Sequence, residues 1–472
     1  MAFLIGGANS AADTGFSVAN SCRFDKGSSS FLDLTFGTPT NGHIWNFSCW
    51  TKRTNLGSGT PLWAPLFGDS GSPDCRFYFR EDDFRFDGYH ASGAFGFQTT
   101  QLFRDVSAWY HVCILWDGTQ AVAGNRAKLF INGIQVTAMA VSDPPDQNAQ
   151  HSVNTAIEHY IGRIVASQYT NVYMAQVCFV DGTVYAISDF GEFNEDSPTI
   201  WQPKDVSGLT FVNNGFLLDF ADSSALGKDV SGKGNDWASN GLDATDQSTD
   251  TPTNNFATLN TVNNYWNAAT FSEGNCVYTS NNTSDYLGFA TSTLGVSKGR
   301  WYFEAKTSTA SGTDIVGISS RAMTSRTTWL GSRTQEYGYY QDNGEIRSNS
   351  ADTSYGSSYT TNDIIGIYMD LDNNLMYVAK NGTLENSGTG HAITAPSSTD
   401  SGFYHFGVGD NSDATQVWQC NFGGCSGFTV SSGNTDANGY GIFEYDPSAG
   451  TFNGGSKDFL ALCTKNLGSD GG

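Results

Sequence analysis

The sequence predicts an all-β protein of two tandem β-sandwiches, jelly-roll-like in strand content, with an irregular packed connector and a C-terminal tail. Aromatic residues make up 14% of the 472 residues and charged residues only 15%, a balance typical of packed strands. The 54 glycines supply the tight turns that join such strands. The length exceeds one ordinary hydrophobic core and suits two large sandwiches.

Apolar residues alternate with period two from about residue 30 to 190, as they do in strands. Residues 109–116 are apolar on both faces, which predicts a central strand buried on both sides. Residues 172–180 predict a further strand. This part of the chain therefore reads as the first sandwich.

Turn residues place the hairpins. Asn132-Gly133 interrupts an apolar pattern, and Asn-Gly supplies the two positive-φ positions of a type I′ turn, so residues 128–136 predict a β-hairpin. The buried run 364–371, a turn and the return strand 375–379 predict a meander in the second sandwich.

The strand pattern also sets the domain organisation. It predicts a first sandwich over 1–195, a connector over 196–265, a second sandwich over 266–430 and an extension over 431–472. In the connector the pattern dissolves into small polar residues. Residues 1–25 are either an anchor to a partner or the first edge strand of the first sandwich.

Charge and cysteine usage exclude several classes of protein. With 47 acidic and 24 basic residues the net charge is -23, and no Lys/Arg cluster suggests a nucleic-acid partner. No apolar run approaches 18 residues, so we expect no membrane insertion. The nine cysteines lack paired spacing, so we expect free thiols rather than disulfides or zinc. The start lacks a secretory signal, so an extracellular role implies release by lysis.

The second region carries strand and turn motifs in a fixed order. They are Lys298-Gly299-Arg300-Trp301-Tyr302-Phe303-Glu304, Val316-Gly317-Ile318, Tyr337-Gly338-Tyr339-Tyr340, Asn343-Gly344, the run 362–372, Lys380-Asn381-Gly382 and Asn421-Phe422-Gly423. Their order and spacing resemble a SPRY domain. The resemblance implies a bent sandwich that binds partners through loops at one end, and no chemistry.

The first region has its own set of motifs. They are Phe47-Ser48-Cys49-Trp50-Thr51-Lys52-Arg53, Ser107-Ala108-Trp109-Tyr110-His111-Val112, Lys128-Leu129-Phe130-Ile131-Asn132-Gly133 and Tyr160-Ile161-Gly162-Arg163. This set resembles a concanavalin A-like, laminin G-like lectin sandwich.

The whole order of motifs carries a third resemblance. It adds the segment 229–237, Asp250-Thr251-Pro252-Thr253-Asn254 and the segment 460–467 to the two sandwiches. This arrangement resembles lectin-domain structural proteins of bacteriophages. It implies a virion protein that contacts other virion proteins and, in a tail fibre or appendage, host-surface glycans. The alternative is a capsid- or tail-decorating protein. A weak lectin gains avidity from repetition, so we expect a homo-oligomer, most simply a trimer.

Catalysis is not expected, although concanavalin A-like folds include glycosidases. A retaining glycosidase needs two carboxyl groups on one cleft, and no strand carries that spacing. The nearest acidic groups are Glu192 with Glu195 and the run 81–83, which suit solvated loops. The seven histidines stand singly.

A calcium site is the one cofactor that the sequence suggests. Asp229, Asn235 and Asp236 supply hard oxygen ligands in a loop whose glycines permit tight folding. The alternative is a plain turn with Asx hydrogen bonds.

The candidate glycan site lies in the second region. Aromatic platforms with a few polar groups hold sugars, and such residues gather at the expected loops. The candidates are Trp329, Arg333, Tyr340, Tyr355 and Tyr359. Trp329 and Arg333 are the best exposed candidates, Tyr337 and Tyr339 are expected in the core, and simple packing is the alternative for the whole set.

Overall fold

The computed structural model describes residues 15–56, 63–72, 74–90, 93–164, 168–263, 269–280, 288–309, 312–323, 325, 327–411 and 415–470. These residues form β-strands, short 3-10 turns and, within the described ranges, one α-helix, α1 (Thr464–Asp470). The all-β prediction is confirmed. The chain forms two compact units that divide between Thr253 and Asn254.

None of the helices in the described ranges has the length and apolar character of a membrane span.

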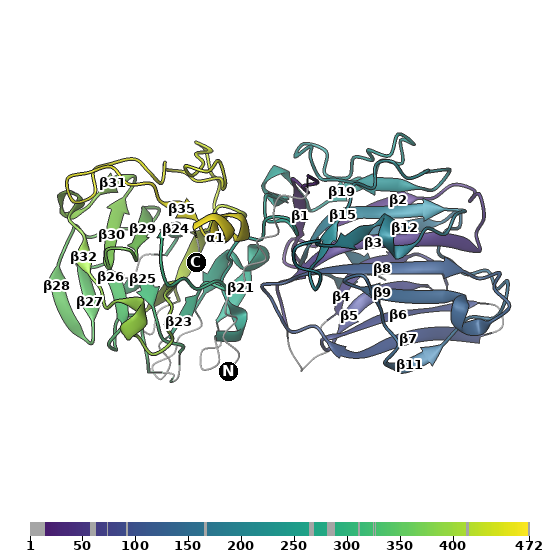
Figure 1. Ribbon diagram of the computed structural model, residues 1–472, viewed down its shortest axis with the longest axis horizontal. Coiled ribbons are helices and arrows are strands. Elements are labelled where there is room, and N and C mark those ends of the chain that lie inside the picture. The colour runs from purple at the N-terminus through teal and green to yellow at the C-terminus, as the bar shows by residue number, and fades with distance from the viewer. Residues whose placement is uncertain are drawn as a thin grey trace. The chain divides into compact units, whose positions relative to one another are not determined.

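Two facing sheets build the first unit (Figure 1). Among the described residues, sheet A has the order β10 (Ile134–Gln135), β9 (Ala127–Ile131), β8 (Trp109–Asp117), β3 (Ile44–Arg53), β15 (Val172–Asp181), β1 (Ser21–Phe24) and β20 (Gln247–Ser248), with β18 (Phe216–Leu218) also paired to β15. Sheet B has the order β11 (Met139–Asp143), β7 (Gly93–Leu102), β6 (Asp83–His90), β5 (Arg76–Arg80), β4 (Trp63–Asp69), β12 (Glu158–Ile161), β2 (Phe31–Thr35) and β19 (Ala238–Asn240).

An aromatic core fills the space between sheets A and B. Trp45 and Trp116 are fully buried and stack with their ring centroids 5.2 Å apart. Phe77 of sheet B packs on Trp45. The predicted central strand is β8, which lies between β3 and β9 with both faces buried. That prediction is confirmed.

The predicted hairpin is β9 and β10, which pair antiparallel. Its turn residues Asn132 and Gly133 have φ values of 48° and 77°, the left-handed pair that a type I′ turn requires. Small hairpins elsewhere join β13 (Arg163–Ile164) to β14 (Gln168–Tyr169) and β16 (Gly191–Phe193) to β17 (Trp201–Pro203).

The segment expected as a connector is divided between the two units. Its residues up to Thr253 belong to the first unit, where β18 and β20 extend sheet A and β19 extends sheet B. Trp237 is buried against Phe216, with ring centroids 4.9 Å apart. Short strands in polar sequence lack an alternation signal, which explains why the pattern alone suggested a connector.

The N-terminal segment contributes core structure where it is described. Strand β1 lies between β15 and β20, so residues 21–24 are an inner strand of sheet A. The expectation of an anchor at 1–25 otherwise concerns residues 1–14, which lie outside the described residues.

The second unit also has two sheets (Figure 1). Among the described residues, sheet C has the order β21 (Thr270–Ser272), β22 (Val277–Thr279), β34 (Val417–Asn421), β24 (Arg300–Thr307), β29 (Ile364–Asp370), β30 (Leu375–Lys380) and β31 (Thr383–Leu384), and β32 (His391–Ala392) pairs with β30. Sheet D has the order β23 (Gly288–Thr291), β33 (His405–Asp410), β25 (Asp314–Ser319), β26 (Glu336–Tyr340), β27 (Glu345–Ser348) and β28 (Ala351–Ser354). Strands β29 and β30 are the predicted meander, which is confirmed.

The C-terminal extension packs on the outer face of sheet C. Strand β35 (Leu460–Ala461) pairs parallel with β24. A buried aromatic layer joins the extension to the sheet, with Phe443, Phe452 and Phe459 against Tyr302, Tyr368 and Tyr377. The tail is therefore part of the second unit.

The nine cysteines are all buried free thiols, as expected.

Candidate functional site

Two of the predicted ligand-binding tyrosines are core residues. Tyr355 and Tyr359 are 7% and 4% exposed and lie in the main hydrophobic cluster of the second unit. The Tyr355 hydroxyl donates to Thr389 O over 2.8 Å, and the Tyr359 hydroxyl donates to Asp314 O over 2.7 Å. A hydroxyl group bonded to backbone inside the core orders the fold and does not face a ligand. Tyr337 and Tyr339 are buried as expected.

Of the other predicted residues, Trp329 and Arg333 lie in the segment 327–335, which packs on Tyr340 of sheet D. Arg333 donates from Nε to Oε1 of buried Glu336 over 2.9 Å and from an η nitrogen to Ala322 O. These bonds fix the loop, so Arg333 is less available than expected. Trp329 is half-buried and packs beside Leu330 and buried Tyr340.

Sequence reasoning missed Arg347 at this place. Its guanidinium lies 3.4 Å from the ring centroid of Tyr340 and 5.9 Å from that of Trp329, and its Nε lies 3.0 Å from Asp352. Trp329 and Arg347 are both half-buried at this place. No local signal identifies Arg347, because the contact joins separate strands.

The predicted calcium loop is held together by its own hydrogen bonds. Asp229 is buried and its carboxylate accepts from the backbone of Leu217, Ser231 and Asn235. Asp236 forms an exposed ion pair with Lys228 at 2.8 Å. This is the geometry of the Asx-turn alternative.

Within the described ranges, no group of three or more His, Cys, Asp or Glu side chains has the geometry of a metal site. Calcium binding by Asp229, Asn235 and Asp236 stays a prediction. The ion would have to replace the N–H groups that now satisfy Asp229.

The two sheets of the first unit have different outer faces. Cys113, Leu115 and Val180 on the outer face of sheet A are buried under residues of the segment 185–217. The outward positions of sheet B carry many charged, aromatic and other polar side chains instead, and many of these are half-exposed. Strand alternation produces this pattern, since the neighbouring residues in each strand enter the core. We call the outward side of sheet B the outer face.

One cluster on the outer face surrounds Trp63. Its indole stacks on Tyr78 with ring centroids 4.8 Å apart, and the guanidinium of Arg80 lies 4.9 Å from its ring. Arg76 contacts the same ring at 5.9 Å and donates two hydrogen bonds to Asp74. The result is a half-exposed aromatic ring with two cations beside it.

Polar groups extend this cluster across the next strands. Arg85 pairs with Asp83 at 2.7 Å, and Tyr78 donates to Asp87 over 2.6 Å. Burial raises the pKa of Asp87, and the bond from Tyr78 opposes that shift. Gln98 donates to Asp83 from the neighbouring strand. Paired donors and acceptors of this kind match the hydroxyl groups of a sugar.

A second cluster on the outer face surrounds Arg163. Its guanidinium lies 4.6 Å from the ring centroid of Phe31, 4.5 Å from that of Tyr160 and 6.0 Å from that of Tyr169. Tyr160 donates to Glu158, and burial together with this bond raises the pKa of Tyr160 to about 12.

The two clusters lie along one row of the sheet. Tyr160 is in register with Gly68, and Gly68 with Arg76. Adjacent strands are about 4.8 Å apart, so the backbones of Tyr160 and Arg76, one from each cluster, are about 10 Å apart. Arg163 and Ile164 of the β13–β14 hairpin lie over Gly68 between them. The sequence held one signal for this face, the alternation in Arg76-Phe77-Tyr78-Phe79-Arg80, whose outward positions are all polar or amphipathic.

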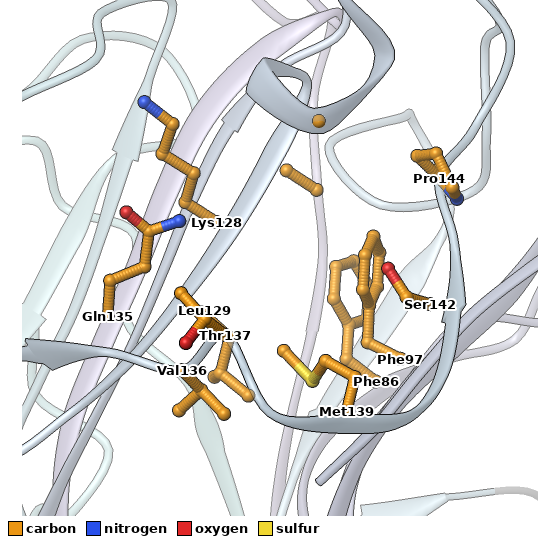
Figure 2. A pocket seen from close by; sticks show the side chains of 12 residues that line it. Phe86, Phe97, Lys128, Leu129, Gln135, Val136, Thr137, Met139, Ser142 and Pro144 are labelled. Atoms are coloured by element: carbon orange, nitrogen blue, oxygen red, sulfur yellow. The ribbon is translucent and has the colours of Figure 1, made fainter.

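A pocket of about 210 Å³ opens at the edge of the same sandwich (Figure 2). Phe86 and Phe97 of sheet B face Leu129 of sheet A across it, and Met139 closes its lower side. The amine of Lys128 points away from the two phenyl rings. The lining is mixed, because Gln135, Thr137 and Ser142 contribute polar groups beside these apolar side chains.

A buried serine and histidine in sheet A do not form a catalytic pair. Ser48 Oγ lies 2.8 Å from His111 Nε2, while the Trp201 indole donates to His111 Nδ1 over 3.0 Å. Nδ1 is thus the acceptor, so in the neutral ring Nε2 carries the proton and donates to Ser48. Burial lowers the pKa of His111 to about 3. This imidazole cannot accept the serine proton.

Two family models match the chain. Residues 26–185 match the concanavalin A-like lectin/glucanases superfamily, and residues 300–424 match the SPRY domain. A concanavalin A-like domain therefore precedes a SPRY domain, as expected. No curated protein matches the chain.

Solved structures resemble parts of the chain at low identity. The SPRY domain of human HERC1 is 16% identical with a TM-score of 0.25, covering 30% of this chain and 86% of that one. A heptameric SAP-like pentraxin from Limulus polyphemus is 14% identical with a TM-score of 0.26, covering 36% of this chain and 80% of that one.

Proposed function

We propose that the chain is a non-catalytic binding protein whose first unit holds glycans on the outer face of sheet B. The observation that carries the proposal is the row of aromatic and charged side chains around Trp63 and Arg163 on that face. Rings stack on the apolar faces of sugars, and arginine–carboxylate pairs exchange hydrogen bonds with their hydroxyl groups. The match to a lectin superfamily supports this assignment.

A glycan array with the purified chain tests the proposal. Trp63→Ala and Arg163→Ala should each reduce binding to the best glycan by about tenfold, the effect of losing roughly 1.4 kcal/mol. Trp329→Ala, in the second unit, is the matched control and should bind like the parent. Loss of binding in Trp329→Ala alone would instead place the glycan site in the second unit. Thermal melting of each variant separates loss of a site from loss of the fold.

We further propose that the chain is a virion protein of a tailed bacteriophage, on a fibre or appendage that contacts the host surface. Its support is the order of motifs, from the first sandwich through the segment 229–237 to the segment 460–467. Repetition on a particle would turn weak sites into avidity, and a homo-oligomer such as a trimer provides it.

A decorating protein of the capsid or tail is the second candidate, because a SPRY domain is compatible with protein partners. Labelling particles with an antibody against the chain distinguishes the two. Signal at the tail tip supports the first assignment, a regular lattice on the head supports the second, and absence of the chain from purified particles contradicts both.

A further inference from the structure

Strand β11 ends sheet B among the described strands, beyond β7. Its first residue, Met139, is half-buried and the other four are exposed. An edge strand presents a row of backbone N–H and C=O groups at strand spacing, and another extended chain satisfies such a row. A small ligand cannot.

The pocket of Figure 2 opens beside this edge. Met139 and Ser142 of β11 line it together with Leu129 of β9 and Gln135 of β10. Its volume of about 210 Å³ is near that of a cavity that accepts one benzene ring, about 150 Å³, and below the 300 Å³ or more of most ligand sites. The pocket therefore has the size of one apolar side chain.

Exposed apolar residues occur along the chain beside the pocket. Ile134 is 64% exposed next to the lining residue Gln135. Val141 is 44% exposed and in register with Gln98, so its side chain lies on the outer face of sheet B, on the other side of the strand from the pocket. Side chains of a strand added to β11 would alternate, and every second one would point toward sheet A across the pocket mouth.

Charge indicates what kind of chain fits. Asp143 is exposed at the end of β11 and forms no ion pair with any described residue. It lies in the same row as Gly96 and Asp87. The chain as a whole has a net charge of -23, which disfavours pairing with a second copy of itself.

We propose that β11 docks an extended segment of a different, basic protein, which adds to sheet B as a strand and inserts one apolar side chain into the pocket. Backbone pairing with β11 supplies part of the affinity, the pocket selects the side chain, and Asp143 attracts a lysine or arginine. This interaction is separate from the proposed glycan site.

Methyl NMR on the full chain tests the proposal, because the chain has six methionines and the Met139 methyl lies in the pocket. The probe is the end-blocked peptide Lys-Val-Thr-Phe-Thr-Val-Lys, and its control carries serine in place of phenylalanine. Met139→Leu identifies the signal. The phenylalanine peptide should shift the Met139 signal, the serine peptide should bind about tenfold more weakly, and the buried Met174 and Met376 signals should not move.

Variants distinguish strand pairing at β11 from insertion of a side chain into the pocket. Val141→Lys, at the edge, should weaken the peptide at least about tenfold, while Val184→Lys, a valine of similar exposure in the same unit, should not. Ala127→Leu fills the pocket and should abolish the preference for the phenylalanine peptide. If this variant fails to fold, the comparison of Val141→Lys with Val184→Lys still tests strand docking. A Met139 signal that responds to toluene but not to the peptide would overturn strand docking, as would equal binding by Val141→Lys and Val184→Lys.

Discussion

A fully buried ion pair lies in the first unit. Lys52 and Asp250 are fully buried, with Nζ 2.6 Å from Oδ2, and the Trp109 indole donates to the other carboxylate oxygen over 3.0 Å. Removing one partner of such a pair leaves the other as an uncompensated charge in a medium of low polarity. The sequence alone does not predict this ion pair, because the two residues are far apart in the chain.

Lys52→Met should therefore destabilise the first unit by about 3–5 kcal/mol. The matched control is Lys228→Met, which removes an exposed pair with Asp236 and should leave the melting profile unchanged. Calorimetry of the full chain measures both. Equal melting of the two variants would mean that Asp250 finds other compensation.

The tyrosines of the second unit show which burial states the sequence can predict. It identified aromatic candidates around Trp329 and the tyrosines that follow it, and it placed Tyr337 and Tyr339 in the core correctly. It could not tell that Tyr355 and Tyr359 are also in the core, because tyrosine suits both a core and a surface. Only tertiary contacts decide between them.

At the scale of elements, the important fact is which face each segment covers. Alternation along strands such as β5 reveals two faces, but it does not say that the segment 185–217 covers the outward side of sheet A while Trp63 and Arg76 of sheet B stay half-exposed. The hairpins and the meander were predictable, because their turn residues and periods are local signals. The candidate glycan face was not, since it combines four or more strands.

The C-terminal extension is one such covering segment. Phe443 is fully buried against Tyr302, with ring centroids 5.1 Å apart, whereas its neighbour Ile442 is 43% exposed. Phe443→Ala should cost the second unit about 3–5 kcal/mol of unfolding free energy. Ile442→Ala is the adjacent control and should cost much less. Denaturant unfolding measures both, and similar losses would show that the extension packs loosely.

A buried carboxyl group ties the same extension to sheet C. Glu304 accepts from the Tyr302 hydroxyl, the Asn421 amide and the backbone N–H groups of Glu444 and Tyr445. Burial raises its pKa from 4.5 to about 7, and these hydrogen bonds oppose the shift. Between these two pH values the folded state keeps a proton that the unfolded state has lost. Its contribution to stability is therefore complete below pH 4.5 and is lost as pH rises to about 7.

We accordingly expect the stability of the parent relative to Glu304→Gln to fall by about 3 kcal/mol between these pH values. The quantity to measure is the difference in unfolding free energy between the parent and Glu304→Gln. Burial also lowers the pKa of His391 and His405, whose contribution to the pH dependence has the opposite sign to that of Glu304 but is the same in both proteins. Asp342→Asn, at an exposed position of the same unit, should keep the parent's slope. A constant difference between parent and Glu304→Gln would contradict the titration of Glu304 in this range.

The described chain forms two sandwiches, and each sheet contains strands from distant parts of the sequence. Length and strand pattern were enough to predict two sandwiches in tandem, since each needs its own core. The exact division was not predictable. Strands β18, β19 and β20 are two or three residues long and lie in polar sequence, where period-two alternation is too short to detect.

Fragments of the chain test this division directly. Residues 1–253 contain every strand of sheets A and B, whereas residues 1–195 lack β18, β19 and β20 and also Trp237, which closes the core beside Phe216. Losing a buried tryptophan alone costs about 3–5 kcal/mol, a large share of the 5–15 kcal/mol that stabilises a typical domain. We expect 1–253 to unfold cooperatively and 1–195 to aggregate or to melt without a sharp transition. Residues 254–472, with the extension attached, should also unfold cooperatively. Equal melting of 1–195 and 1–253 would show instead that residues 196–253 are a connector added to a complete sandwich.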